Sequence, residues 1–140
     1  MIVVHHLETS RSHRILWLLE ELDLPYELKV YKRDSKTRVA PPELKMIHPL
    51  GKSPVIEDDG EVIAESAAII EYLVELYGMN AQGDLAHLQP AADTKAYRQC
   101  RFWMHYAEGS LMCRRASNIT HLRAMEDYSG TIASFSKLAC

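Results

Sequence analysis

Two helical segments alternate with short strand-like segments in the first 77 residues, and this alternation most constrains the fold. Residues 2–7 and 26–31 predict strands, the second with one buried face. Between them, residues 10–22 predict a helix, which ends at Asp23-Leu24-Pro25. The apolar side chains expected on one face of this helix are Ile15, Leu18, Leu19 and Leu22. Alternation of this kind predicts a sheet covered by helices.

Residues 41–77 predict a short helix, a hairpin and a longer helix. Pro41-Pro42 starts a helix through Met46, because proline suits a first helical turn. Residues 53–57 and 61–64 predict the two strands of a hairpin around an Asp-Gly turn. In the helix expected over 65–77, the common face carries Ile69, Tyr72, Leu73 and Leu76. The hairpin adds antiparallel pairs, so the expected fold class is α/β with a mixed sheet.

The sequence changes character after residue 77. Residues 78–89 contain two glycines and predict a linker. Residues 90–115 predict one long helix whose apolar side chains occupy most of its circumference. Such a helix needs partners on more than one side. Residues 116–140 show no clear pattern and are left unassigned.

Charge and cysteine content exclude several classes of protein. A net charge of −3 argues against nucleic-acid binding that depends on neutralising phosphates. The scattered cysteines, Cys100, Cys113 and Cys140, favour thiols over a disulfide framework or a structural zinc site. The apolar start, residues 1–4, is too short for a signal peptide, and no apolar run is long enough for a membrane span. We therefore expect a cytoplasmic protein with no metal.

Four segments carry a resemblance to a known family. They are residues 7–22, which include Ser10-Arg11-Ser12, residues 48–56, which include Lys52-Ser53-Pro54, residues 64–69, which include Glu65-Ser66, and residues 101–112. In this order they resemble the soluble glutathione transferases that use a serine. The resemblance implies a thioredoxin-like N-terminal domain, of order βαβ-α-ββα, followed by an all-helical domain.

The resemblance also implies domain boundaries. We expect the thioredoxin-like domain at 1–81, a linker at 82–91 and helical structure from 92. The family's second domain is a bundle of several helices, and residues 92–140 are too few to build it, so we expect an incomplete domain with an unassigned tail from about 116. Large apolar side chains of the long helix then lack part of their cover. Low stability or aggregation through that helix is the predicted consequence.

The activity implied by the resemblance is conjugation of the glutathione thiolate to hydrophobic electrophiles, a detoxification reaction carried out by a homodimer. Glutathione is then a co-substrate. One alternative is a non-catalytic glutathione-binding or protein-binding module, which an incomplete second domain favours. Another is a glutathione-dependent reductase or peroxidase, and the absence of a cysteine near Ser10 weighs against the reductase.

Ser10 is the candidate catalytic residue. A free thiol has a pKa of about 8.5, and a hydroxyl donating to the sulfur beside a helix N-terminus lowers it. In the family this hydroxyl lies just after the first strand, which favours Ser10. Thr9 and Ser12 are rivals, and a plain helix-capping role for Ser10 or Ser12 is the structural alternative.

Five residues are implied as glutathione-binding. The bond before Pro54 is expected to be cis, turning the backbone of Ser53 toward the cysteinyl part, although the family more often has an aliphatic residue at this serine. Ser66 suits the γ-glutamyl carboxylate and Glu65 suits the ammonium group. The alternative for this pair is a helix cap with an acid that complements the dipole. Lys52 suits the glycyl carboxylate or is simply solvated.

Other residues are weaker candidates. His48 follows the short helix and lies in the second motif. Trp103, Tyr106 and Met112 either line a pocket for the electrophile or belong to a core, which is the commoner role of large apolar residues on a helix.

Overall fold

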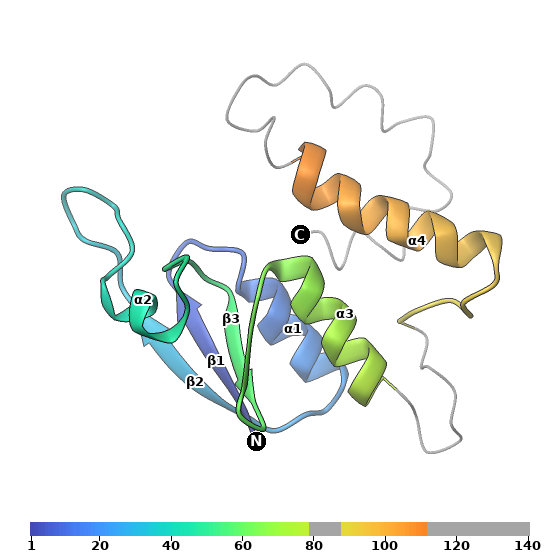
Figure 1. The fold of residues 1–140 in the computed structure, drawn as a ribbon, viewed down its shortest axis with the longest axis horizontal. Coiled ribbons are helices and arrows are strands. Elements are labelled where there is room, and N and C mark those ends of the chain that lie inside the picture. Colours follow the sequence, from blue (N-terminus) through green and yellow to red (C-terminus); the bar gives the residue numbers. More distant parts are fainter. Residues whose placement is uncertain (79–87, 112–140) are drawn as a thin grey trace. The chain divides into compact units, whose positions relative to one another are not determined.

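The computed structural model describes residues 1–78 and 88–111, and the chain divides into two units after Ala86 (Figure 1). The elements of the first unit are β1 (Ile2–Leu7), α1 (His13–Glu21), β2 (Tyr26–Tyr31), α2 (Glu43–Ile47), β3 (Val55–Asp58), β4 (Glu61–Ala64) and α3 (Ser66–Tyr77). The described part of the second unit holds α4 (Lys95–Tyr106) and a π-helical turn, η1 (Ala107–Leu111). The predicted order of elements is confirmed.

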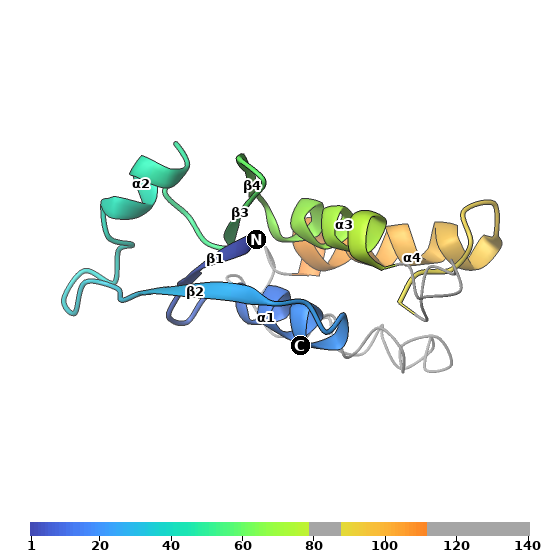
Figure 2. The ribbon, with the colours of Figure 1, turned by 90° about the horizontal axis from the view of Figure 1, so that it is seen from below.

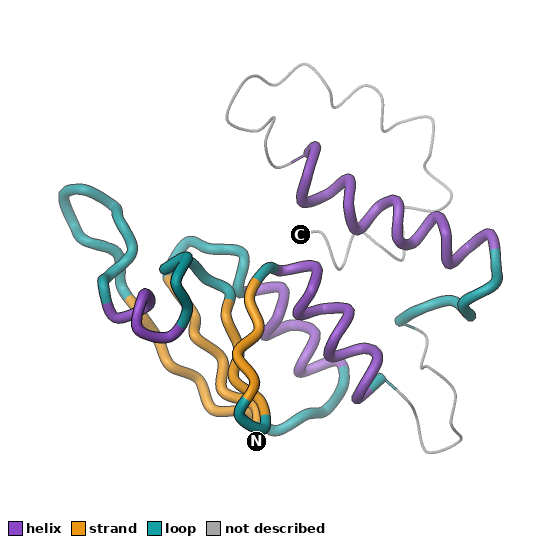
Figure 3. The backbone as a smooth tube through the Cα atoms, in the orientation of Figure 1, coloured by secondary structure: helices purple, strands orange, loops and turns teal. Residues whose placement is uncertain are grey.

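The sheet is mixed, as expected. Its strand order is β2-β1-β3-β4. β1 pairs in parallel with β2, with Val4 opposite Leu28, and in antiparallel with β3, with Val4 opposite Ile56. β3 and β4 form the antiparallel hairpin. Because β1 is an inner strand, between β2 and β3, the residues that follow it leave the sheet from its interior and not from an edge strand (Figure 3).

Helices cover both faces of the sheet. α1 and α3 lie side by side on one face, and α2 lies on the other (Figures 1 and 2). The fully buried side chains of this unit include Val4, Ile15, Leu18, Ile69 and Leu73. The periodicity of the first helix is confirmed, because Ile15, Leu18 and Leu19 are all buried. This core fixes the loops that lead into α1 and α3.

Two predictions of burial are wrong. β2 has no buried residue, and Leu28 and Val30 are 43% and 60% exposed, because β2 is an edge strand and is paired on one side only. Leu76 is 57% exposed because it lies in the last turn of α3, and the buried face of that helix ends at Val74.

The second unit differs from its prediction at both ends of the helix. α4 begins at Lys95 rather than at residue 90, and Thr94 caps it by accepting a hydrogen bond from the Tyr97 N–H at 3.1 Å. The α-helical geometry gives way to η1 after Tyr106. Within α4 only Cys100 is buried, and the Phe102 side chain is 59% exposed. Residues 79–87 and 112–140, with Met112, Cys113, Cys140, most of the expected linker and the unassigned tail, lie outside the described residues.

Candidate functional site

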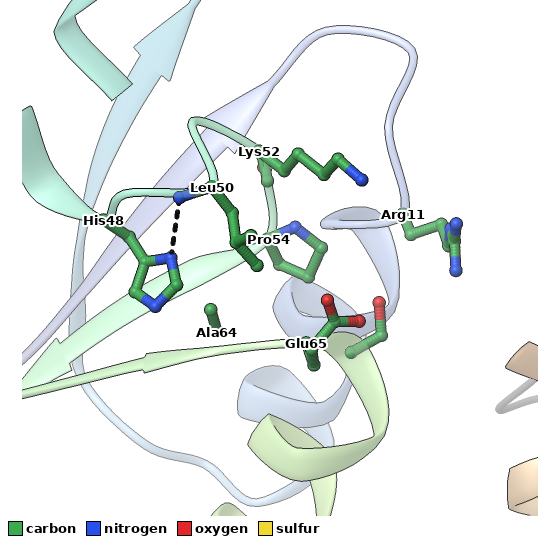
Figure 4. A pocket seen from close by; sticks show the side chains of 9 residues that line it. Arg11, His48, Leu50, Lys52, Pro54, Ala64 and Glu65 are labelled. Carbon is green, nitrogen blue, oxygen red and sulfur yellow. Dashed lines mark hydrogen bonds between the residues drawn. The ribbon is translucent and has the colours of Figure 1, made fainter. Parts of the chain in front are cut away.

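A cavity of about 100 Å³ lies in the first unit, where the loop before β3 meets the start of α3 (Figure 4). It brings together all five residues expected to bind glutathione, namely Lys52, Ser53, Pro54, Glu65 and Ser66. Arg11, His48, Leu50 and Ala64 complete the lining. Segments separated by more than fifty residues along the chain therefore converge on one site.

The loop before β3 supplies one side of the cavity. The Ser53–Pro54 peptide bond is cis, as the resemblance implied. The Ser53 hydroxyl donates to the carbonyl oxygen of His5 at 2.8 Å and accepts from the Leu7 N–H at 3.2 Å. These two bonds fasten the loop to the central strand, because both partners belong to β1.

The start of α3 supplies the opposite side. Glu65 precedes the helix with a φ of 76°, a left-handed value that is rare outside glycine and concentrates at functional sites. Its side chain makes no capping hydrogen bond to the helix. Ser66 is 3% exposed and is the first residue of the helix. The N-terminal N–H groups of a 12-residue helix suit an anion.

Charged groups are distributed unevenly around the cavity. Figure 4 shows Lys52 and Arg11 on one side of Pro54, and the Glu65 carboxylate directed toward the space beside that proline. The His48 Nδ1 atom accepts a hydrogen bond from the Leu50 N–H at 3.4 Å and so takes part in a local turn. Two cations facing one carboxylate fit a ligand that carries both signs of charge.

Arg11 was not among the predicted binding residues. The only signal for it was its position inside the Ser10-Arg11-Ser12 motif. Its place in the cavity lining depends on how the turn after β1 approaches the loop before β3, which no local pattern encodes.

The turn between β1 and α1 carries the three candidate hydroxyls. Ser10 is half-buried and its Oγ atom lies 3.4 Å from the Ser53 Oγ atom, so it adjoins the cavity. Thr9 is exposed and has a φ of 52°. Ser12 is fully buried, with its Oγ atom 2.7 Å from that of Ser10. Of the three, Ser10 is the hydroxyl that is both near the cavity and accessible.

Ser12 occupies the N-cap position of α1 but makes no side-chain capping hydrogen bond. The capping alternative is therefore wrong for Ser12. Its Oγ atom instead lies 2.7 Å from the Nδ1 atom of His6 on β1. Burial, and secondarily the charge of His13, lowers the pKa of His6 below its ordinary value of 6.5.

Arg33 holds this turn from the loop after β2. Its guanidinium donates to the carbonyl oxygens of Glu8 at 3.1 Å and of Thr9 at 3.4 Å. A third donor reaches the carbonyl oxygen of Arg38 at 3.1 Å. No local sequence pattern indicates this role, since the contact spans 24 residues. The Arg33 guanidinium thereby satisfies backbone carbonyl groups that follow β1.

Residues 1–75 match the family described as glutathione S-transferase, N-terminal domain. The chain belongs to this family. It is 48% identical over 116 residues to glutathione S-transferase 3 of Schizosaccharomyces pombe, covering 80% of this chain and 43% of the relative. It is 43% identical over 117 residues to glutathione S-transferase 1 of Saccharomyces cerevisiae, covering 79% and 47%.

Solved structures agree with this family. The crystal structure of a glutathione S-transferase from Actinobacillus pleuropneumoniae is 38% identical, with a TM-score of 0.73, and the match covers 99% of this chain and 59% of that one. The thioredoxin-like fold of the first unit is thereby confirmed. The chain spans less than half the length of the two yeast relatives.

No helix within residues 1–78 and 88–111 is long and apolar enough to cross a membrane. Over the same ranges, no three His, Cys, Asp or Glu side chains gather as metal ligands. A site without metal remains a prediction.

Proposed function

We propose that this chain is the glutathione-binding part of a glutathione transferase. Glutathione occupies the cavity, and the Ser10 hydroxyl stabilises its thiolate for attack on a hydrophobic electrophile. One observation carries the proposal: residues from the loop before β3 and from the start of α3 line a single cavity, and Ser10 adjoins it through Ser53.

The charges of the cavity match those of glutathione, which carries two carboxylates, one ammonium group and a thiol. Ser66 and the N-terminal N–H groups of α3 suit the γ-glutamyl carboxylate, and Glu65 suits the neighbouring ammonium. Lys52, joined by Arg11, suits the glycyl carboxylate. The thiol then lies toward Pro54 and Ser53, on the side where Ser10 is found.

Ser10 acts on the ionisation of the thiol. A hydrogen bond to a charged group contributes about 1.5–3 kcal/mol, which corresponds to a pKa lowered by about one to two units. A thiol with a pKa of about 8.5 would then have a pKa of about 6.5–7.5, so a substantial fraction would be ionised near pH 7. The reaction forms a carbon–sulfur bond at the electrophile and releases the electrophile's leaving group, where it has one, while the thiol proton goes to solvent.

The rest of the proposal concerns the second unit and the assembly. The rings of Trp103 and Tyr106 lie edge to face with centroids 5.5 Å apart, an apolar cluster suited to an electrophile. The domain limits of 1–81, 82–91 and 92–140, a homodimer and a cytoplasmic, detoxifying role belong to the same proposal. They rest on the family to which the chain belongs.

Calorimetric titration of the chain with glutathione tests the binding site. Ser66→Ala removes a hydroxyl from the carboxylate site, so we expect the dissociation constant to rise tenfold or more. Ser35→Ala is the matched control, because Ser35 is an exposed loop serine, and its affinity should equal that of the parent. Ser10→Ala should bind glutathione with similar affinity but raise the thiol pKa.

Two results would oppose the proposal. A well-folded chain that does not bind millimolar glutathione would refute it and leave the protein-binding module as the better interpretation. Glutathione binding without conjugation of an aryl halide would support the site but refute transferase activity in this chain.

A further inference from the structure

Ser12 is a buried serine whose hydroxyl does not cap the helix it begins. It is fully buried, and its Oγ atom lies 2.7 Å from both the Ser10 Oγ atom and the His6 Nδ1 atom. Its own backbone N–H donates to the Ser10 Oγ atom at 3.3 Å. A serine in this position ordinarily accepts from the first turn of the helix. The diverted hydroxyl connects the sheet to the candidate catalytic serine.

We propose that Ser12 and His6 are positioning residues, which orient the Ser10 hydroxyl so that it donates to the thiolate of bound glutathione. This inference rests on the proposed function. The hydroxyls form a chain in which each oxygen accepts one hydrogen bond and donates the next. His6 Nδ1–H donates to Ser12, Ser12 donates to Ser10, and Ser10 donates onward.

The fixed donor in this neighbourhood is the Ser53 hydroxyl, and it favours this direction at the outer end of the chain. The Ser53 hydroxyl gives its proton to the His5 carbonyl oxygen, so toward Ser10 it serves only as an acceptor. Without glutathione, the Ser10 proton therefore has the Ser53 oxygen as a distant acceptor, at 3.4 Å. A thiolate is a charged acceptor and forms the stronger hydrogen bond. The Ser10 hydroxyl therefore donates to the sulfur of bound glutathione instead of to the Ser53 oxygen.

The protonation of His6 is consistent with this direction. Burial lowers the pKa of His6, so the neutral ring prevails at neutral pH. A neutral ring donates from Nδ1 in one of its two tautomers, and the charged ring donates from both nitrogens. The thiolate at the far end selects the tautomer with hydrogen on Nδ1, because only that tautomer leaves the Ser10 hydroxyl free to donate outward.

The chain also strengthens the last bond. A hydroxyl that accepts a hydrogen bond becomes a better donor, and burial of Ser12 keeps water from competing at the middle link. Loss of Ser12 leaves Ser10 accepting only from a backbone N–H at 3.3 Å, and its hydroxyl is then free to rotate. The expected consequence is a less stabilised thiolate and so a higher thiol pKa, with little change in glutathione affinity at pH values below that pKa.

The test is a pH titration of the thiolate absorbance of glutathione bound to the full 140-residue chain. Ser12→Ala should raise the thiol pKa by about half a unit, a roughly threefold loss of thiolate at pH values well below the thiol pKa. His6→Phe, which keeps a ring but removes Nδ1, should do the same. His6→Asn places an amide near the position of Nδ1 and should restore most of the effect.

A double-mutant cycle separates positioning from packing. In a Ser10→Ala background, Ser12→Ala should produce no further shift, because the chain then has no outlet to the sulfur. An equal shift in both backgrounds, or a Ser12→Ala variant that binds glutathione with the parent thiol pKa, would overturn the inference. Failure of the proposed function looks different, because the parent chain itself would then not bind glutathione or would leave its thiol pKa unchanged.

Discussion

The helices α1 and α4 begin with the same class of residue but use it differently. α1 begins after Ser12, which is fully buried and whose hydroxyl oxygen lies 2.7 Å from both His6 Nδ1 and Ser10 Oγ. α4 begins after Thr94, which is exposed and accepts a hydrogen bond from the Tyr97 N–H. One helix start is tied to tertiary neighbours and the other to its own first turn.

The two helices also differ in what they bury. α1 has nine residues and buries Ile15, Leu18 and Leu19, whereas α4 has twelve residues and buries only Cys100. A helix held by a buried face does not need a side-chain cap, because packing supplies most of its stability. Tertiary packing thus releases Ser12 from capping and makes its hydroxyl available to the site.

The largest expected effect is on the buried face of α1. Leu18→Ala removes a fully buried side chain and should lower the free energy of unfolding by about 2–5 kcal/mol. Leu76→Ala is the matched control, because the same truncation at a 57% exposed site should cost less than about 0.5 kcal/mol. Urea denaturation measures both. Equal losses for the two variants would mean that α1 is not anchored by its apolar face.

The next effect concerns the cap of α4. Thr94→Ala removes the acceptor for the Tyr97 N–H and should cost about 1 kcal/mol of helix stability. Thr94→Ser keeps the oxygen and should remain close to the parent, and neither variant should alter the thiol pKa of bound glutathione. Thermal unfolding followed by circular dichroism at 222 nm, the helix band, provides the measurement. A Thr94→Ala variant that shifted the thiol pKa would erase the distinction between the two helix starts.

Local patterns predicted most of the fold, and long-range contacts explain the rest. Apolar spacing is local, so it located α1, α3 and the order of the strands along the chain. The start of α4 differs from the predicted residue 90 because Thr94, a single residue inside the broader helical pattern, caps the helix. The same limit applies to the site. Motifs indicated Ser66, but the roles of Arg33 and of the His6–Ser12 pair depend on contacts between separate elements.

A smaller effect is the pH dependence of stability that His6, beside the start of α1, should produce. The folded pKa of His6 lies below 6.5, so below that pH the unfolded chain binds more protons than the folded chain. The stabilisation that comes from keeping His6 neutral is complete above pH 6.5. It is lost as the pH falls toward the lowered pKa of His6 in the folded chain. Unfolding midpoints between pH 8 and pH 5 should fall for the parent and fall less for His6→Phe. A parallel pH dependence in both proteins would show that His6 does not titrate differently on folding.

The smallest effect is expected on the aromatic face of α4. Phe102 is 59% exposed and stacks on Tyr106 with ring centroids 5.9 Å apart, so Phe102→Ser should change the free energy of unfolding by no more than about 0.5 kcal/mol. An exposed aromatic side chain also promotes association, so the variant should be more monodisperse than the parent in light scattering. Tyr97→Ser is a control on the same helix, where a half-buried tyrosine is removed instead. A loss close to the roughly 3–5 kcal/mol expected for a buried phenylalanine would show that this face is covered in solution. The contrast between a packed α1 and a locally capped α4 would then have to be abandoned.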